Sequence, residues 1–239
     1  MKAVEWLRRA DRAVLDVVYP ERSFCLNCGR VSGGSVLCGR CLQEAEELRR
    51  EGDMCPRCGR YLTGEDGCGF CRDGHWLPDG ARSVWSHAGP PRKLVHRLKH
   101  SAVEAAGEFL GQEMAWAARE LPVPGDAVVT WVPMPKQRLR QRGIDHGRVL
   151  AQAVAEELGL ECRPLMERTV KKLTTQQGLN CRERQRNLRD TLRALPEAAG
   201  RTVLLTDDVL TTGQTANSCA QVLLEAGAER VLVVTATMP

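Results

Sequence analysis

The sequence RTVLLTDDVLTTGQT occupies residues 201–215 and decides the fold of the larger part of the chain. It begins with an apolar run over residues 203–205, which is typical of a strand buried on both faces of a parallel sheet. Two carboxylates, Asp207 and Asp208, end this run, and a hydroxyl-rich turn with a glycine follows. Residues 216–226 then have the apolar spacing of a helix. We therefore predict a strand, a turn and a helix in direct succession.

The chemistry of this turn suits a phosphorylated sugar. Backbone N–H groups at a helix N-terminus bind anions, and the hydroxyls of Thr212 and Thr215 add donors. Asp207 and Asp208 can accept hydrogen bonds from vicinal hydroxyls or hold a hydrated magnesium ion (Mg2+), although a solvated loop explains a bare pair of aspartates. The string resembles the signature by which type I phosphoribosyltransferases bind 5-phosphoribosyl-1-diphosphate (PRPP). The resemblance implies a PRPP site formed by Asp207, Asp208, Thr211, Thr212, Gly213, Gln214 and Thr215.

Eight cysteines form an internal repeat near the start of the chain. Each unit contains two Cys-x-x-Cys pairs separated by nine residues, and Gly-Arg follows the first pair of each. Four thiolates complete a tetrahedral zinc (Zn2+) site of the structural kind, which leaves no position for a catalytic water. Disulfides in a secreted domain are the alternative; the lack of a signal peptide before the cysteines disfavours them. Spacing leaves open whether each unit binds its own zinc or the units exchange ligands. The predicted ligands are Cys25, Cys28, Cys38, Cys41, Cys55, Cys58, Cys68 and Cys71.

Length and charge limit the domain organisation of the chain. A chain of 239 residues with net charge +4 accommodates an α/β core of about 150 residues and a small metal-stapled module. We predict an amphipathic helix over residues 1–20, a double zinc ribbon over 22–75 and the α/β domain over 80–239. No apolar run approaches the roughly 20 residues that cross a bilayer, and free cysteines favour the cytoplasm. The first helix is expected to pack on the zinc module, with peripheral contact at the inner face of the membrane as the alternative.

Strands and helices alternate along the rest of the chain. Apolar runs predict strands near residues 83–86, 128–132, 202–206 and 231–235, and helices near 91–98, 102–121 and 145–158. This order indicates a parallel sheet with right-handed crossovers and helices on both faces.

Three loops should meet at the carboxyl edge of this sheet, where open α/β folds bind ligands. The first, residues 133–138, contains Lys136 and Arg138. The second, residues 168–187, is long and basic and contains Lys171 and Lys172. The third is residues 207–215. By position the first two resemble the loops of phosphoribosyltransferases that contact the diphosphate of PRPP; solvated surface loops are the alternative.

Several short motifs in order resemble the ComF family. They are LDVVYP (15–20), HRLK (96–99), VPMPK (132–136), RLRQRG (138–143), QQGL (176–179) and the Asp207-Asp208 signature. The resemblance implies a domain like the type I phosphoribosyltransferases behind an N-terminal zinc ribbon. It also implies a role in natural competence, at the cytoplasmic side of the membrane, with single-stranded DNA and proteins of the uptake machinery as partners.

Three functions remain open from the sequence. Thr211 stands where purine-transferring relatives have an aspartate that acts as a general base, and no base-selecting hood is evident. We therefore favour a protein that binds PRPP, or another phosphoribosyl ligand, without base transfer. The alternative is an active phosphoribosyltransferase in which Asp207, Asp208 and Mg2+ assist displacement of diphosphate at the ribose C1. The third alternative is that the site no longer binds a ligand and that the ribbons serve only as a docking module.

Overall fold

The computed structural model describes residues 23–62, 67–72, 76–169 and 191–239. At its centre is a five-stranded sheet in the order β1-β7-β6-β2-β3, and every neighbouring pair is parallel. A separate two-stranded antiparallel sheet joins β4 and β5. The strands are β1 (Gly80–Ser86), β2 (Val128–Trp131), β3 (Glu161–Cys162), β4 (Met166–Arg168), β5 (Leu192–Ala194), β6 (Thr202–Val209) and β7 (Arg230–Met238).

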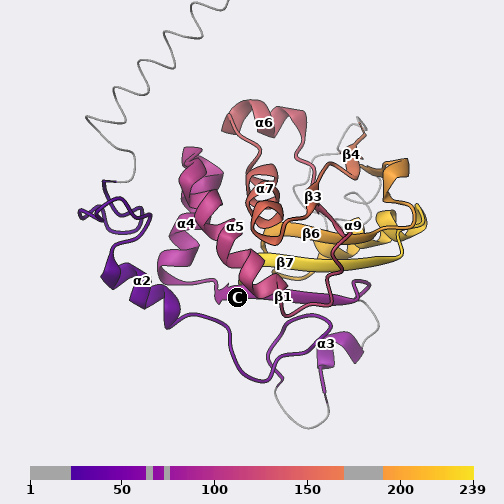
Figure 1. Ribbon diagram of the computed structural model, residues 1–239, viewed down its shortest axis with the longest axis horizontal. Helices are drawn as coiled ribbons and strands as arrows, with labels where there is room; N and C mark the ends of the chain where they lie inside the picture. Colours follow the sequence, from indigo (N-terminus) through magenta and orange to yellow (C-terminus); the bar gives the residue numbers. More distant parts are fainter. Residues whose placement is uncertain (1–22, 63–66, 73–75, 170–190) are drawn as a thin grey trace, which may run out of the picture.

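The two central strands are buried because both of their faces are covered. All residues of β7 except Arg230 are buried. Leu204, Leu232 and Val234 pack with α4, α5 and α7 on one face, whereas Val203 and Val233 pack with α9 on the other. Figure 1 shows α4, α5 and α7 side by side over the sheet. The predicted parallel sheet with helices on both faces is confirmed. These helices are α4 (Gly89–Ser101), α5 (Glu104–Ala118), α7 (His146–Leu158) and α9 (Gln214–Glu225).

A glycine allows α5 and α7 to approach closely. A Cβ at Gly111 would lie 2.5 Å from the Cβ of Ala153 and 2.9 Å from the carbonyl oxygen of Leu150. The helices therefore pack almost backbone to backbone. This contact fixes the direction in which the N-terminus of α7 points.

The two Cys-rich units lie at different places on the α/β domain. The first contains α2 (Gly39–Glu46) and packs on α4. Nζ of Lys93, in α4, donates a hydrogen bond to the carbonyl oxygen of Asn27 in this unit at 3.2 Å. The second contains α3 (Gly69–Arg72), which Figure 1 shows on the far side of β1 from α4. The connection between the units runs along the edge of β1, where the N–H of Arg50 donates to the carbonyl of Val84 at 2.8 Å.

The structure differs from the sequence predictions in some local bounds. The loop predicted over residues 133–138 is short, because α6 (Lys136–Arg142) begins inside it. Residues 1–20, and Lys171 and Lys172 of the second loop, lie outside the described residues. None of the helices described is both long and apolar enough to span a bilayer.

Candidate functional site

Asp207 and Asp208 lie within β6, so the prediction that they belong to the loop after the strand was wrong. The ladder with β7 continues past them, pairing Asp207 with Thr235 and Val209 with Thr237. Successive residues of a strand point to opposite faces. Asp208 therefore faces α4 and α7, while Asp207 lies on the face covered by α9. The two carboxylates have different surroundings.

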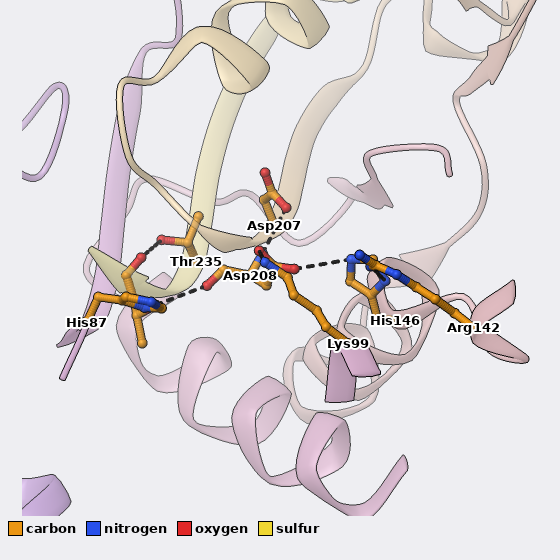
Figure 2. A network of polar contacts seen from close by, with 8 residues as sticks. His87, Lys99, Arg142, His146, Asp207, Asp208 and Thr235 are labelled. Atoms are coloured by element: carbon orange, nitrogen blue, oxygen red, sulfur yellow. Dashed lines mark hydrogen bonds and ion pairs between the residues drawn. The ribbon is translucent and has the colours of Figure 1, made fainter. Parts of the chain in front are cut away.

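Asp208 joins three elements of the fold. Its side chain is buried, its Oδ1 lies 2.7 Å from Nζ of Lys99 in the last turn of α4, and its Oδ2 lies 3.1 Å from Nε2 of His146 at the start of α7 (Figure 2). Burial acts to raise the pKa of Asp208, but the hydrogen bond from His146 and the charge and hydrogen bond of Lys99 outweigh it and hold the pKa below the usual value. Asp208 is therefore ionised, and both of its oxygens are engaged.

The direction of the hydrogen bonds of His146 follows from its second neighbour. Nη1 of Arg142, in the last turn of α6, lies 3.1 Å from Nδ1 of His146 (Figure 2). A guanidinium group only donates, so Nδ1 accepts and Nε2 carries the proton that is donated to Asp208. His146 thus lies between Arg142 and Asp208 and contacts both.

Asp207 is the less satisfied carboxylate. Its Oδ1 accepts a hydrogen bond from the N–H of Asp208 at 2.9 Å, and the described residues supply no other. Burial and the neighbouring charge of Asp208 raise its pKa to about 7. Asp207 is therefore the carboxylate of the pair that retains capacity for a ligand.

The turn after β6 leads directly into the N-terminus of α9. Gly213 is the N-cap of α9 with φ of 75°, a left-handed conformation that glycine adopts without strain. Thr211 and Thr212 are exposed, and Thr215 lies in the first turn of α9. We name residues 210–215 the phosphate turn.

A cavity of about 590 Å³ lies between this turn, the end of β6 and the segment after β2. Four cationic side chains line it against two carboxylates, so it favours an anion. Arg168 is held in place by hydrogen bonds from Nε to the carbonyl of Pro133 at 2.8 Å and from Nη1 to Oγ1 of Thr191 at 2.9 Å. The charged lining residues are Lys99, Arg138, Arg142, Arg168, Asp207 and Asp208, with His146 beside them.

The predicted site residues divide into three groups. Arg138, Thr211 and Thr215 line the cavity with the aspartates. Thr212, Gly213 and Gln214 belong to the phosphate turn but not to the lining, and Lys136 is exposed at the start of α6 outside it. Lys171 and Lys172 lie outside the described residues.

Four ionisable residues of the cavity were not predicted as ligand contacts: Lys99, Arg142, His146 and Arg168. The sequence carried partial signals for two of them. Lys99 lies in the basic stretch of residues 92–100, and His146 follows Asp145, which has the residue type of a helix N-cap.

Each Cys-rich unit closes on itself. The four sulfur atoms of Cys25, Cys28, Cys38 and Cys41 lie within 4.8 Å of one another, and so do those of Cys55, Cys58, Cys68 and Cys71. Contacts such as Cys28–Cys38 at 3.7 Å and Cys55–Cys71 at 3.8 Å match the edge of about 3.8 Å that Zn–S bonds of about 2.3 Å produce in a tetrahedron. They are too long for disulfides, whose sulfurs lie about 2.05 Å apart. The units therefore fit two separate structural zinc ions.

Comparison with known families agrees with both modules. The double zinc ribbon domain matches residues 14–72, and the phosphoribosyl transferase domain matches residues 144–237. Among solved structures, the allosteric regulatory enzyme of purine biosynthesis is 26% identical with a TM-score of 0.38, covering 56% of this chain and 26% of that one.

Two curated relatives span most of the chain. "DNA utilization protein YhgH" of Salmonella typhi is 34% identical over 203 residues, covering 82% of this chain and 88% of the relative. "Competence protein F" of Haemophilus influenzae is 26% identical over 209 residues with the same coverage. The similarity therefore extends over most of this chain and most of each relative.

Proposed function

Since the chain belongs to the ComF family, we propose that it binds a 5-phosphoribosyl ligand, with PRPP as the reference compound, and takes part in the handling of DNA during competence. One observation carries the ligand proposal. A cavity with excess positive charge contains an available carboxylate, Asp207, and opens onto the N-terminus of a helix of 12 residues. Phosphate groups suit the positive side chains and helix end, whereas ribose hydroxyls suit the carboxylate.

Magnesium fits one position in this arrangement. Asp208 already uses both oxygens for Lys99 and His146, so Asp207 is the protein residue that would hold a hydrated Mg2+ beside the ligand. When bound, the ion would neutralise part of the charge of the diphosphate.

We also propose that the ligand is bound without transfer to a base. Asp207 and Asp208 are the carboxylates of the cavity lining, and both are assigned to ribose binding or to the fold. Thr211 supplies a hydroxyl, which is not a general base near neutral pH. Among the other described lining residues, His146 is the group able to take a proton, and both of its ring nitrogens are already engaged, by Arg142 and by Asp208.

Calorimetric titration of PRPP and Mg2+ into zinc-loaded protein tests the ligand proposal. Asp207→Asn is expected to weaken binding about tenfold or more, because a ligand hydrogen bond to a charged group is lost. Asp126→Asn, an exposed residue in the segment before β2, is the matched control and should bind as the wild type does. Absence of binding to the wild type would reject the proposal.

Measuring diphosphate release in the presence of purine and pyrimidine bases distinguishes binding without transfer from the alternative, an active phosphoribosyltransferase. We expect none above the rate without protein. Release that depends on a base and disappears in Asp207→Asn would establish an active phosphoribosyltransferase instead. In a transformable host, chromosomal Asp207→Asn is expected to lower the number of transformants while Asp126→Asn leaves it unchanged.

A further inference from the structure

The second zinc ribbon, residues 55–72, contacts the back of the phosphate turn. Nη2 of Arg60 donates a hydrogen bond to the carbonyl oxygen of Thr211 at 2.5 Å, across 151 positions of sequence. The same guanidinium lies 4.3 Å from the ring centroid of Phe70, which follows the third cysteine of the unit. A side chain fixed by the metal-binding unit thus holds a backbone atom of the turn.

Two further contacts brace the same turn. A Cβ at Gly213 would lie 2.8 Å from Cζ3 of Trp76, so the indole packs directly on the N-cap of α9. Trp76 is buried, and its Nε1 donates to the carbonyl of Arg57 at 2.8 Å. One residue later, the N–H of Leu77 donates to Oδ1 of Asn217 in α9 at 2.9 Å. The turn lies between the ribbon on one side and the cavity on the other.

The first ribbon provides an internal comparison, because the two units are repeats. Arg30 and Arg60 occupy the same position, and each main-chain carbonyl accepts from the first cysteine of its unit, at 2.7 and 2.8 Å. The surroundings of the repeats differ. Arg30 is exposed, and a Cβ at Gly29 would meet nothing within 4 Å, whereas one at Gly59 would lie 2.9 Å from the carbonyl oxygen of Ala81.

We propose that Arg60 is a positioning residue for the phosphate turn, through which the zinc site of the second ribbon, and not that of the first, sets the conformation that accepts the ligand's phosphate. Cys55 and Cys58, which would hold the zinc, lie in the loop on which Arg60 stands, and Arg60 in turn binds the carbonyl of Thr211. With that carbonyl turned toward the ribbon, the N–H groups of the turn are free to face the cavity. The part of this inference that concerns ligand binding rests on the proposed function; the part that concerns the turn does not.

The test compares Arg60→Ala with Arg30→Ala in the zinc-loaded full chain. Amide hydrogen exchange over residues 211–217 is the first measurement, and PRPP–Mg2+ affinity by calorimetry is the second. Arg60→Ala should speed exchange and weaken binding, each about tenfold, since a charge-assisted hydrogen bond to the turn is lost. Arg30→Ala should change neither. Arg60→Lys retains a donor and should restore part of both effects, which a general loss of packing would not allow.

Zinc content checks that the ribbons remain folded. If Arg60→Ala loses zinc, Arg60→Met replaces it, because this variant keeps an unbranched side chain of similar length and removes the guanidinium; faster exchange in the turn is again expected. Unchanged exchange in the Arg60 variants, or an equal effect of Arg30→Ala, would overturn the inference. A wild type that fails to bind PRPP would reject the proposed function, while the exchange data would still decide whether Arg60 positions the turn.

Discussion

The unequal carboxylates predict opposite effects of two neighbouring substitutions on stability. The pKa of Asp207 is raised, by burial and by Asp208, from 3.8 to about 7. The folded protein therefore holds a proton that the unfolded chain releases between about pH 4 and pH 7, and stability falls as the pH rises through this range. Above pH 7 the folded state carries the full cost of the charge. Asp207→Asn removes that cost and keeps an oxygen to accept the N–H of Asp208.

The size of the stability gain expected for Asp207→Asn follows from the pKa of Asp207. At 1.36 kcal/mol per unit, the shift corresponds to about 4 kcal/mol, and solvent screening of the partly exposed side chain reduces this to about 2 kcal/mol at pH 8. At pH 5 the gain should fall to about a third of that value. Urea unfolding of zinc-loaded protein at the two pH values, followed by far-UV circular dichroism, measures both differences.

Asp208→Asn is the paired variant and should act in the opposite direction. The pKa of Asp208 is lowered because His146 and Lys99 outweigh burial, so its charge stabilises the fold above about pH 4 and this contribution is lost as the pH falls through the folded pKa. Losing the charge should cost about 2 kcal/mol at pH 8. A destabilising Asp207→Asn, or a gain that does not depend on pH, would refute the division of roles between the two aspartates.

Two other substitutions test the phosphate turn and the ribbons. Gly213→Ala should destabilise the protein by about 2–4 kcal/mol, because it combines left-handed strain with a clash against Trp76, whereas Gly143→Ala, with φ of 78° and open space around it, should cost only about 1 kcal/mol in the same unfolding assay. Cys28→Ser should remove one zinc ion per chain by elemental analysis and leave exchange in residues 211–217 unchanged, since the first ribbon does not touch the turn; loss of both ions would show that the two sites are interdependent.

Local signals were sufficient for the sheet and the turn. The apolar run before Asp207 and the glycine after it are contiguous in sequence, so the strand, turn and helix could be predicted from a single window. The end of β6 was misplaced because aspartates disfavour strands, whereas pairing with β7 carries the strand through to Val209. The closure of each zinc site within its own unit could not be predicted, because both units have the same spacing.

The polar contacts of the site required the fold. Lys99, His146 and Asp208 come from three elements, and they meet only because α4 and α7 pack on the same face of β6. No local pattern predicts the contact of Arg60 with Thr211, which depends on where the second ribbon lies on the domain. Basic composition indicated an anion site, but not which cations would form it.

The arrangement explains why the protein has two adjacent aspartates, although a single carboxylate would be enough to bind the hydroxyls of a ribose. Asp208 is satisfied by Lys99 and His146, so it ties α4 and α7 to the sheet and fixes the edge of the cavity. Its charge in turn raises the pKa of Asp207, which the fold leaves with unused hydrogen-bonding capacity. A ligand hydroxyl or a cation that satisfies Asp207 relieves this cost, so part of the binding free energy is stored in the unliganded protein. Occupation of the cavity should therefore lower the pKa of Asp207 and release a proton near neutral pH, which calorimetry in buffers of different ionisation enthalpy would detect.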